Sequence, residues 1–414
     1  MRVPIFVIVG AGLAGARAAE AIRSEGFDGG IVLLAGEDEH PYVRPPLSKD
    51  YLAGTSARDT IDVHPAEWYR DRGIDVRLGN RVTGLALDTH EVTLEEGRAV
   101  RYDKLLLATG ASSRRFPGSG AALDGVHHLR TVVESQALRA ELEPGNRRVV
   151  IVGAGWIGLE VAAAARGYGN AVTVLGREGA PLAAVIGAEV GSVFAELHRV
   201  NGVELRTGTR TVDLMGAGGH VTGVLLSDGE VVPADVVVVG IGAEPNTELA
   251  RDAGMAVDDG IVVDAAFRSI DPDVYAVGDV ASVFHPVLRH HLRLEHWDNA
   301  ERAGAAAGRS MLDQAVSYDA IPYFYTDQFD LGMEYSGYGT LARGAEVVFR
   351  GDRAGREFMA FWVADGQVVA GLNVNVWNVN ETVQRFIRTG VRVDASRLAD
   401  ESIALDELLA GAPD

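Results

Sequence analysis

Two short glycine-rich stretches constrain the fold of this 414-residue chain more than any other feature. The first fingerprint is Gly10-Ala11-Gly12-Leu13-Ala14-Gly15, and the second is Gly153-Ala154-Gly155-Trp156-Ile157-Gly158. Each follows a short apolar run, Ile5–Val9 or Val149–Val152, and opens an alanine-rich segment with helical spacing. A strand, a glycine turn and a helix in this order predict a nucleotide-binding βαβ unit, which this chain contains twice.

Each glycine of a fingerprint has a physical task. The first permits the tight turn, the second lets a pyrophosphate approach the backbone, and the third lets the helix pack closely on the strand. The phosphates then lie at the positive end of the helix dipole. Two complete fingerprints predict two dinucleotides, and a flavin with a nicotinamide is the combination that provides a hydride donor and a hydride acceptor.

Two acids near the fingerprints each have two interpretations. Glu37 follows Gly15 at about the spacing expected for the acid that binds a ribose hydroxyl, and a solvated acid in Glu37-Asp38-Glu39 is the alternative. Glu160 comes two residues after Gly158. The pattern alone favours a helix N-terminal acid that the dipole stabilises.

Other strand ends add to the nucleotide sites. Ala108-Thr109-Gly110 ends one predicted strand, and Gly278-Asp279 ends another, where an aspartate can accept hydrogen bonds from a sugar or ribityl hydroxyl. The run through Gly242 indicates the crossing from the second nucleotide domain back to the first. The flavin domain is therefore expected to be discontinuous in sequence.

The fold class that these patterns predict is α/β, with two Rossmann-like dinucleotide-binding domains of the glutathione-reductase type and a C-terminal α+β domain. Apolar runs bounded by glycine predict buried parallel strands. Alternating stretches at 79–101 and 208–232 predict hairpins, and aromatic residues concentrate after about Tyr318. The expected domains are FAD-binding (1–115 and 243–317), NAD(P)H-binding (116–242) and C-terminal (318–414).

Composition excludes several chemistries. The chain has no cysteine, which excludes disulfide scaffolds, cysteine-ligated iron–sulfur clusters, thiolate nucleophiles and redox-active disulfides. Its net charge of −20 disfavours binding to nucleic acid or to an anionic membrane, so an acidic partner would need a local basic patch. The run Met1–Val9 is short for a signal peptide and stops at Gly10. We expect a soluble, cytoplasmic protein.

Beyond these patterns, the chain resembles the NAD(P)H-dependent, FAD-containing ferredoxin reductases of bacterial cytochrome P450 and ring-hydroxylating dioxygenase systems. The resemblance covers essentially the whole chain. Its most specific motif is Pro41-Tyr42-Val43-Arg44-Pro45-Pro46-Leu47-Ser48-Lys49, supported by Arg130-Thr131, the second fingerprint with Leu159-Glu160, and Asp327-Gln328.

The resemblance implies a role for each site residue. The first fingerprint (Gly10, Gly12, Leu13, Ala14, Gly15) and Glu37 would hold the FAD adenylate half, with Val82 near the adenine. Further FAD contacts would come from Arg44, Pro45, Ala108, Thr109, Gly110, Arg130, Gly278, Asp279 and Trp297. The second fingerprint (Gly153, Gly155, Trp156, Ile157, Gly158) and Gly242 would hold NAD(P)H, and Arg177, where the chain departs from the family pattern, is a further candidate for this cofactor. Lys49 and Glu160 would pair at the nicotinamide and act in catalysis, with Lys49 near the flavin.

The expected activity is electron transfer from NAD(P)H through FAD to a [2Fe–2S] ferredoxin that feeds a cytochrome P450 or a dioxygenase. Without cysteine, the electrons cannot pass to an internal disulfide. The alternatives are a quinone or oxygen reductase and a redox-responsive flavoprotein like apoptosis-inducing factor. We expect no metal site, because neither adjacent histidine pair forms a metal fork unaided. Arginines 289, 293, 302 and 309, in a segment expected to be helical, are either a ferredoxin patch or a salt-bridged surface.

The identity of the nicotinamide cofactor is the point at which the chain departs from the family pattern. NADH-dependent members place a glutamate where Gly176 stands, and here Arg177 follows instead. An arginine at this place suits the 2′-phosphate of NADPH, although Glu178 is close by. We therefore expect NADPH to be accepted unusually well.

Overall fold

The computed structural model describes residues 2–409, which form two compact units. Unit 1 combines Met1–Pro45, Ala57–Ser112 and Ala243–Ala320, and unit 2 combines Pro46–Ser56, Ser113–Gly242 and Ile321–Asp414. Each unit is described by itself. Residue 1 and residues 410–414 lie outside the described part. The first expected domain and the run Met1–Val9 include residue 1, and the expected C-terminal domain includes residues 410–414.

Unit 1 contains a five-stranded parallel sheet with the strand order β19-β7-β1-β2-β3. These strands are β1 (Ile5–Val9), β2 (Gly30–Leu34), β3 (Ile74–Arg77), β7 (Lys104–Leu107) and β19 (Val274–Ala276). Helices α1 (Leu13–Ser24) and α7 (Trp297–Met311) share one hydrophobic core with the sheet. Strands β1 and β2 consist of apolar residues and are buried apart from their first residues, as expected for strands of a parallel sheet that is covered on both faces.

Smaller elements complete unit 1. The other face of the sheet packs on a three-stranded antiparallel sheet, β4 (Val82–Ala86), β5 (Glu91–Leu94) and β6 (Ala99–Arg101). A second small sheet contains β18 (Ile261–Val263), β20 (Ala281–His285) and β21 (His290–Leu292). The remaining elements are α2 (Ala66–Asp71), α6 (Glu248–Asp252), β8 (Ala111–Ser113), β17 (Ala243–Pro245), η2 (Arg58–Ile61) and η4 (Gly278–Val280).

Unit 2 repeats the parallel arrangement, with the strand order β12-β11-β10-β16-β9. The strands are β9 (Val126–His127), β10 (Arg148–Val152), β11 (Ala171–Leu175), β12 (Val203–Arg206) and β16 (Val236–Val239). The helices are α3 (Val132–Leu142), α4 (Trp156–Gly167) and α5 (Ala183–Val200), with η3 at Ser119–Ala122. A three-stranded antiparallel sheet packs against the parallel strands β10, β11 and β16. It is formed by β13 (Thr211–Ala217), β14 (His220–Leu226) and β15 (Val231–Pro233).

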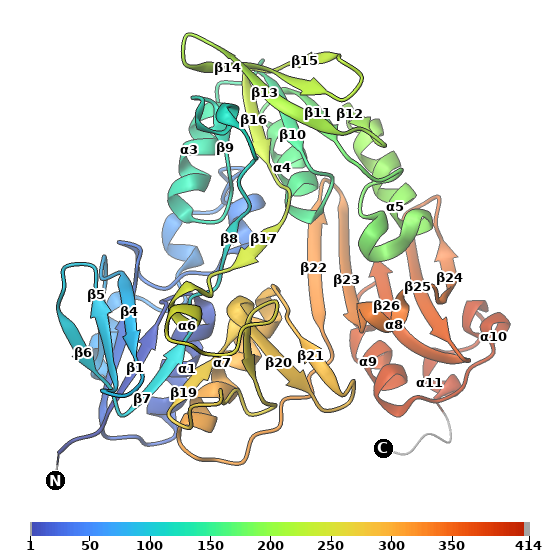
Figure 1. The fold of residues 1–414 in the computed structure, drawn as a ribbon. Coiled ribbons are helices and arrows are strands. Elements are labelled where there is room, and N and C mark those ends of the chain that lie inside the picture. The colour runs from blue at the N-terminus through green and yellow to red at the C-terminus, as the bar shows by residue number, and fades with distance from the viewer. Residues whose placement is uncertain (1, 410–414) are drawn as a thin grey trace. The chain divides into compact units, whose positions relative to one another are not determined.

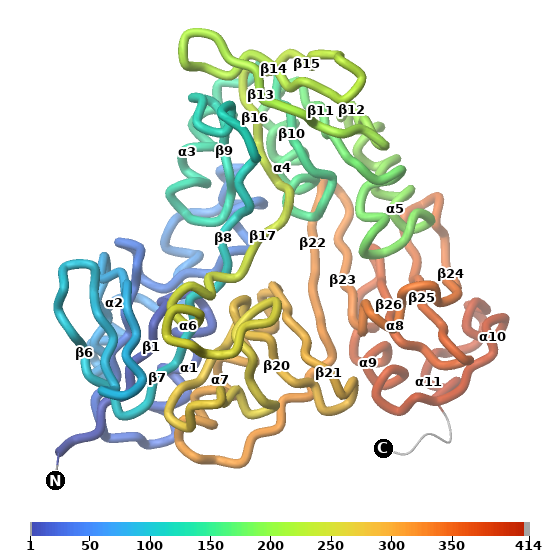
Figure 2. The backbone as a smooth tube through the Cα atoms, in the orientation of Figure 1, coloured from blue at the N-terminus to red at the C-terminus, as the bar shows by residue number. Residues whose placement is uncertain are grey.

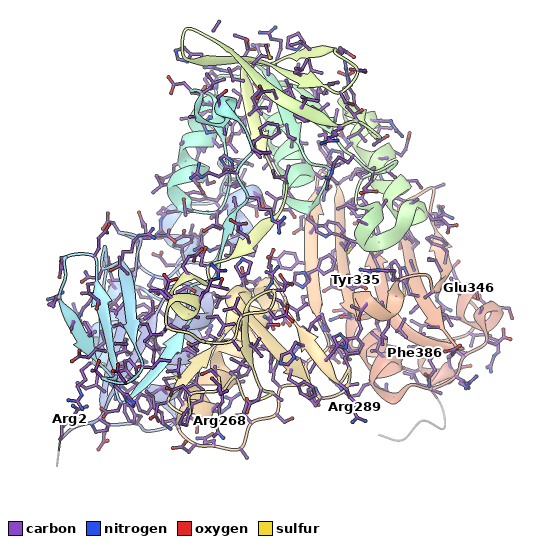
Figure 3. The ribbon with its side chains drawn as sticks, in the orientation of Figure 1. Arg2, Arg268, Arg289, Tyr335, Glu346 and Phe386 are labelled. Atoms are coloured by element: carbon purple, nitrogen blue, oxygen red, sulfur yellow. The ribbon has the colours of Figure 1, made fainter. Side chains whose placement is uncertain are left out.

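The C-terminal part of unit 2 is an antiparallel sheet with the order β22-β23-β26-β25-β24 (Figure 1). Its strands are β22 (Tyr323–Gln328), β23 (Leu331–Gly337), β24 (Glu346–Asp352), β25 (Glu357–Ala364) and β26 (Gln367–Val374). Helices α8 (Gly339–Ala342), α9 (Asn380–Thr389), α10 (Ala395–Ala399) and α11 (Leu405–Leu408) accompany it, and Figure 2 traces the backbone through them. Phe386 of α9, labelled in Figure 3, packs in the core against Phe361.

The predicted fold class is confirmed: two parallel nucleotide-binding sheets and an antiparallel α+β part are present. The segment Pro46–Ser56, which the expected boundaries place with the first domain, packs with unit 2 because the hydroxyl of Ser135 on α3 donates to the Leu47 carbonyl oxygen (2.8 Å). The domain boundaries themselves remain a proposal.

One secondary-structure prediction was wrong. Arg289 lies in the turn between β20 and β21 with φ at +57°, and Arg293 follows β21, so neither is helical (Figure 3). The backbone reverses there to pair β20 with β21 in antiparallel fashion. Only Arg302 and Arg309 of that set lie on a helix, α7.

No helix within residues 2–409 is both long and apolar enough to cross a membrane.

Candidate functional site

The first fingerprint forms a cradle between β1, α1 and the end of β7. Gly10 has φ at +111°, and a Cβ added there would lie 2.1 Å from the carbonyl oxygen of Ala108. A Cβ on Gly15 would lie 2.1 Å from the carbonyl oxygen of Gly10. Around Gly12, by contrast, no heavy atom lies within 4 Å of the added Cβ position. The turn is therefore packed by its outer glycines and open at its middle one, where α1 begins.

The second fingerprint has the same construction. A Cβ on Gly153 (φ +119°) would lie 2.1 Å from the carbonyl oxygen of Gly240, and one on Gly158 would lie 2.2 Å from that of Gly153. The Cβ position of Gly155, which precedes α4, has no heavy atom within 4 Å. Both cradles thus leave backbone open at a helix N-terminus, the geometry that binds a phosphate.

Backbone hydrogen bonds establish which residues of the two cradles are equivalent. Gly10 donates to the carbonyl of Leu34 (2.9 Å), as Gly153 donates to that of Leu175 (2.8 Å). The loops after these strands repeat the pattern as well. The backbone amide of Gly79 donates to the carbonyl oxygen of Glu37 (3.0 Å), as that of Gly208 donates to the carbonyl oxygen of Glu178 (2.8 Å). Glu178 is therefore the counterpart of Glu37, while Gly176 and Arg177 occupy the places of Ala35 and Gly36.

In unit 1, Glu37 is held by two donors from the motif that follows β2. The hydroxyl of Tyr42 donates to one carboxylate oxygen (2.6 Å), and the guanidinium of Arg44 donates to the other (3.0 Å). Burial, the largest influence, acts to lower the pKa of this guanidinium, but Tyr42, Glu37 and Asp279 together raise it above its ordinary value. Glu37 is thus oriented, which agrees with the ribose-binding interpretation better than with a solvated acid.

The second polar group of unit 1 is Asp279, in the single turn η4 that follows β19. Gly278 has φ at +77°, and a Cβ there would lie 3.1 Å from Cβ of Ala14, so the turn lies against the start of α1. Helix α7 begins at Trp297 and packs along α1 in the same core. Of the remaining predicted positions in unit 1, Pro45 begins the turn η1 (Pro45–Ser48), Val82 begins β4, and Ala108, Thr109 and Gly110 follow β7.

In unit 2, Glu160 near the start of α4 forms a buried ion pair with Lys49. The ammonium of Lys49 is 2.7 Å from the carboxylate of Glu160, with the two side chains 11% and 5% exposed. The same carboxylate accepts hydrogen bonds from the hydroxyls of Ser48 and Thr326, at 2.5 Å each. The pair implied by the resemblance is therefore present. The dipole interpretation of Glu160 was incomplete, because its partners come from distant segments of the chain.

The segment carrying Lys49 is fixed to the second nucleotide domain. Besides the bond from Ser135, the amide of Gln136 on α3 donates to the hydroxyl of Tyr51 (2.8 Å). The hydroxyl of Tyr168, beyond α4, donates to the carbonyl of Leu52 (2.9 Å). The turn η1 ends at Ser48, immediately before Lys49.

Strand β22 borders this ion pair. The Lys49 ammonium lies 5.4 Å from the ring centroid of Tyr325, a cation–π contact. Burial, with the negative charges of Asp327 and Glu160, raises the pKa of Tyr325 to about 12. Burial also raises the pKa of Asp327, although Lys49 acts to lower it. Tyr325 of β22 therefore forms part of the surroundings of the ion pair.

The other predicted positions in unit 2 lie near the second fingerprint or on its domain. Trp156 packs between Phe194 and Phe324, at ring-centroid distances of 5.6 and 5.1 Å, and Ile157 is exposed. Gly242 follows β16, and Arg177 is exposed after β11. Arg130 precedes α3, where its amide donates to Glu134 (2.9 Å). Their contacts with a cofactor remain a prediction.

Two of the four arginines considered as a partner surface, Arg293 and Arg302, are salt-bridged. Arg293 pairs with Asp259 (3.1 Å) and with Glu295, and Arg302 pairs with Asp298 (3.3 Å).

Sequence reasoning missed Ser48 and Thr326 as partners of Glu160. A weak signal for each was available: Ser48 is the neighbour of Lys49, and Thr326 is a polar residue that ends an aromatic run in a strand.

The comparisons with known proteins agree with this geometry. A family model described as pyridine nucleotide-disulphide oxidoreductase matches residues 5–304, and one described as reductase C-terminal matches residues 323–409. The match boundary near residue 320 coincides with the start of the antiparallel sheet of unit 2. The family resemblance seen in the sequence is confirmed.

Similar proteins match along their whole length. The anthranilate 1,2-dioxygenase system ferredoxin–NAD(+) reductase component of Burkholderia cepacia is 40% identical over 407 residues, covering 98% of this chain and 99% of that protein. Rhodocoxin reductase of Rhodococcus erythropolis is 35% identical and covers 97% and 93%. The crystal structure of the covalent putidaredoxin reductase–putidaredoxin complex matches with a TM-score of 0.94 at 34% identity, covering 99% of both chains.

Proposed function

Because the chain belongs to the pyridine nucleotide-disulphide oxidoreductase family, we propose that it carries electrons from NAD(P)H through FAD to a ferredoxin. The ferredoxin would be of the [2Fe–2S] type and would feed a cytochrome P450 or a ring-hydroxylating dioxygenase. The names of the full-length relatives support this reading, since they are reductase components of such systems. The cytoplasmic location expected from the sequence belongs to the same proposal.

The observation that carries the proposal is the combination of two nucleotide cradles with a complete lack of cysteine. A member of this family without cysteine has no internal disulfide to reduce. Electrons that enter from a nicotinamide must therefore leave to an external acceptor. Full-length similarity to ferredoxin reductases makes a small electron-transfer protein the best-supported acceptor.

The residues of unit 1 fit an FAD. The open backbone at Gly12 suits a pyrophosphate, and the oriented carboxylate of Glu37 suits a ribose hydroxyl. Asp279 offers a second carboxylate beside α1, and the N-terminus of α7 presents the positive end of a helix dipole. When bound, FAD would accept a two-electron hydride and release single electrons.

In unit 2 the protein's own contribution centres on Lys49 and Glu160. The second cradle, at the N-terminus of α4, would hold the pyrophosphate of NAD(P)H, and Glu160 lies in the first turns of the same helix. Glu160 holds the Lys49 ammonium in one position, the ring of Tyr325 lies beside it, and both charged side chains are largely buried from water. A fixed cation in a dry site stabilises negative charge that develops during hydride transfer, and it needs no reorganisation to do so.

The ion-pair assignment predicts a loss of hydride-transfer rate in Lys49→Met. Removing a preorganised charge from such a site costs about 10²–10³-fold in rate, and we expect FAD content to stay unchanged. Lys104→Met is the matched control, because Lys104 is the only other lysine and is also ion-paired, to Asp313 (2.8 Å) in unit 1. Stopped-flow flavin reduction measures both. Equal rates in the two variants would refute the role of Lys49.

The function itself is tested by reduction of cytochrome c with NADH or NADPH, with and without added [2Fe–2S] ferredoxins. We expect strong stimulation by at least one ferredoxin from a P450 or dioxygenase system. Equal turnover with and without every ferredoxin, together with rapid quinone or oxygen reduction, would instead identify a reductase that needs no protein partner. Poor turnover with all acceptors would indicate a redox-responsive flavoprotein.

A further inference from the structure

We propose that Gln328 and His198 are positioning residues that hold Glu160 in its pairing with Lys49, and that they act through the hydroxyl of Thr326. The inference rests on the proposed role of this ion pair in hydride transfer. It concerns residues of unit 2 alone.

A continuous chain of side-chain hydrogen bonds leads away from Glu160. Oγ1 of Thr326 lies 2.5 Å from the Glu160 carboxylate, and Nε2 of Gln328 lies 3.1 Å from that hydroxyl oxygen. Oε1 of Gln328 lies 2.8 Å from Nε2 of His198. The chain thus joins three elements, because Glu160 belongs to α4, Thr326 and Gln328 to β22, and His198 to α5.

Every member of this chain is buried. Thr326 and His198 are fully buried, Gln328 is 1% exposed and Glu160 is 5% exposed. In such surroundings a broken hydrogen bond is not replaced by water, so each partner strongly constrains the next.

The direction of the bonds follows from the chemistry of the groups. An ionised carboxylate only accepts, so the hydroxyl of Thr326 must donate to Glu160. The hydroxyl proton is then used, and its oxygen accepts from the amide nitrogen of Gln328. This fixes the amide orientation, so the Gln328 oxygen faces Nε2 of His198 and requires a proton there.

The far end of the chain matches this requirement. Nδ1 of His198 is buried and has no hydrogen-bond partner in the described residues, as expected for a neutral ring protonated on Nε2 only. Burial lowers the pKa of His198, although the hydrogen bond to Gln328 acts to raise it. His198 therefore remains neutral and donates from Nε2 only. Every hydrogen bond in the series from His198 to Glu160 then has its donor on the side of His198.

The consequence is a carboxylate that cannot rotate freely. Lys49 and Ser48, which are adjacent in the sequence, contact Glu160 from one polypeptide segment, and Thr326 contacts it from β22. Thr326 and Lys49 share the carboxylate oxygen Oε1 of Glu160, and Ser48 donates to Oε2. If Gln328 is lost, the Thr326 hydroxyl is free to turn away, and Oε1 then keeps only its contact with Lys49. The Lys49 ammonium would then occupy more than one position.

The experiment compares the FAD-loaded variants Thr326→Val, Thr326→Ser and Gln328→Leu by stopped-flow flavin reduction over a range of NADH concentrations. A hydrogen bond to a charged group has a net value that corresponds to about 10–100-fold, so we expect Thr326→Val to lower the limiting rate by at least about tenfold. Gln328→Leu should lower it by about threefold to tenfold, and His198→Met in the same direction. Thr326→Ser, which keeps the hydroxyl, should recover most of the rate.

Ser336→Ala is the matched control. Ser336, on the neighbouring strand β23, is 1% exposed, donates to Asn380 (2.6 Å) and accepts from Gln384 (3.2 Å), so it has a similar buried network without Glu160. We expect this variant to lose thermal stability while its limiting rate stays within about twofold of wild type. A rate loss in Ser336→Ala as large as that in Gln328→Leu would overturn the inference.

The double variant Thr326→Val/Gln328→Leu separates the possibilities further. If Gln328 acts through Thr326, the double variant reduces flavin no more slowly than Thr326→Val alone, whereas additive losses contradict the inference. The proposed function fails separately: wild-type flavin reduction in Lys49→Met would remove the role of the ion pair itself. Slow reduction in Lys49→Met with normal reduction in Gln328→Leu would overturn only the present inference.

Discussion

We propose that residues 176–178 determine which nicotinamide nucleotide binds at the second cradle. Position 176 is glycine and offers no carboxylate to a ribose, whereas Glu178 is the counterpart of Glu37 by its backbone hydrogen bonds. Arg177 is exposed and has no ion pair within residues 2–409. The guanidinium of Arg177 can bind the 2′-phosphate of NADPH, and the neighbouring carboxylate of Glu178 can bind the 2′-hydroxyl of NADH.

We therefore expect NADPH to be used with a kcat/KM comparable to or above that for NADH. Arg177→Gln should reduce kcat/KM for NADPH by about 10–100-fold and affect NADH far less, because a charge-assisted bond to phosphate is lost. Glu178→Gln should act mainly on NADH. Steady-state kinetics with both nucleotides check this, and a wild type that strongly prefers NADH would contradict it.

Inserting a glutamate at Gly176 is a poor way to test this specificity. A Cβ at that position would lie 2.9 Å from Cβ of Ala154, inside the second fingerprint. The substitution would therefore move the pyrophosphate cradle as well as add a carboxylate. Changes at the exposed Arg177 and Glu178 avoid this complication.

At the level of elements, the close packing of α7 on α1 positions the first cradle. A Cβ on Gly304 would lie 2.5 Å from the carbonyl oxygen of Ala14, and one on Gly308 would lie 2.6 Å from that of Ala18. The two helices thus touch backbone to backbone. Because Ala14 belongs to the first fingerprint, any separation of the helices also displaces the nucleotide cradle.

We predict that Gly308→Ala destabilises the protein by about 1–3 kcal/mol, since the added methyl group has no space. This corresponds to a fall in Tm of several degrees, with weaker FAD retention. Gly167→Ala is the matched control: Gly167 also lies in a helix, α4, but its added Cβ has no heavy atom within 4 Å. Thermal unfolding followed by flavin fluorescence measures both, and equal Tm values would refute the close-packing argument.

The elements themselves were largely predictable from the sequence. Buried parallel strands are continuous apolar runs that end in glycine, and the fingerprint glycines mark each turn into a helix, so β1, β10, α1 and α4 could be assigned from local pattern. Local pattern failed where tertiary pairing decides. Arg289 and Arg293 flank the short strand β21, which pairs antiparallel with β20 in the sheet that also contains β18, although their segment has helical composition.

The sites were predictable only in part, for a physical reason. Residues that act through the backbone, such as Gly12 and Gly155, are recognisable because glycine spacing encodes their geometry. The donors around Glu160 are not, because Ser48 and Thr326 are 112 and 166 residues away from it in sequence. No local period records such contacts, and the Lys49–Glu160 pair was anticipated only through family resemblance.

On the scale of the whole molecule, the duplication raises the question of which cradle binds which dinucleotide. The two fingerprints have nearly the same glycine geometry, so the glycines do not distinguish them. The surroundings do. The first cradle has the oriented Glu37, Arg44 and the turn of Asp279, while the second has the exposed Arg177 and the Lys49–Glu160 pair. A permanently held cofactor needs more fixed partners than a substrate that must leave after each turnover.

We therefore predict that FAD is held by unit 1 and NADP⁺ by the second cradle, with separate footprints in amide hydrogen exchange. Removing FAD should increase exchange in the 10–15 turn, η4 and the start of α7. Adding NADP⁺ to the FAD-loaded protein should slow exchange in the 153–158 turn and the loop after β11. Each ligand at 100 times its Kd stabilises the state that binds it by about 2.7 kcal/mol, which is large enough to detect.

The Arg177→Gln variant provides the control for this footprint. It should lose the protection that NADP⁺ gives to the loop after β11, yet keep the protection that FAD gives to unit 1, because Arg177 belongs only to the second cradle. Protection of the 153–158 turn by FAD, or of the 10–15 turn by NADP⁺, would show that the two dinucleotides are assigned to the wrong cradles. The backbone equivalence of the cradles would stand in that case, and the polar residues around them would need new roles.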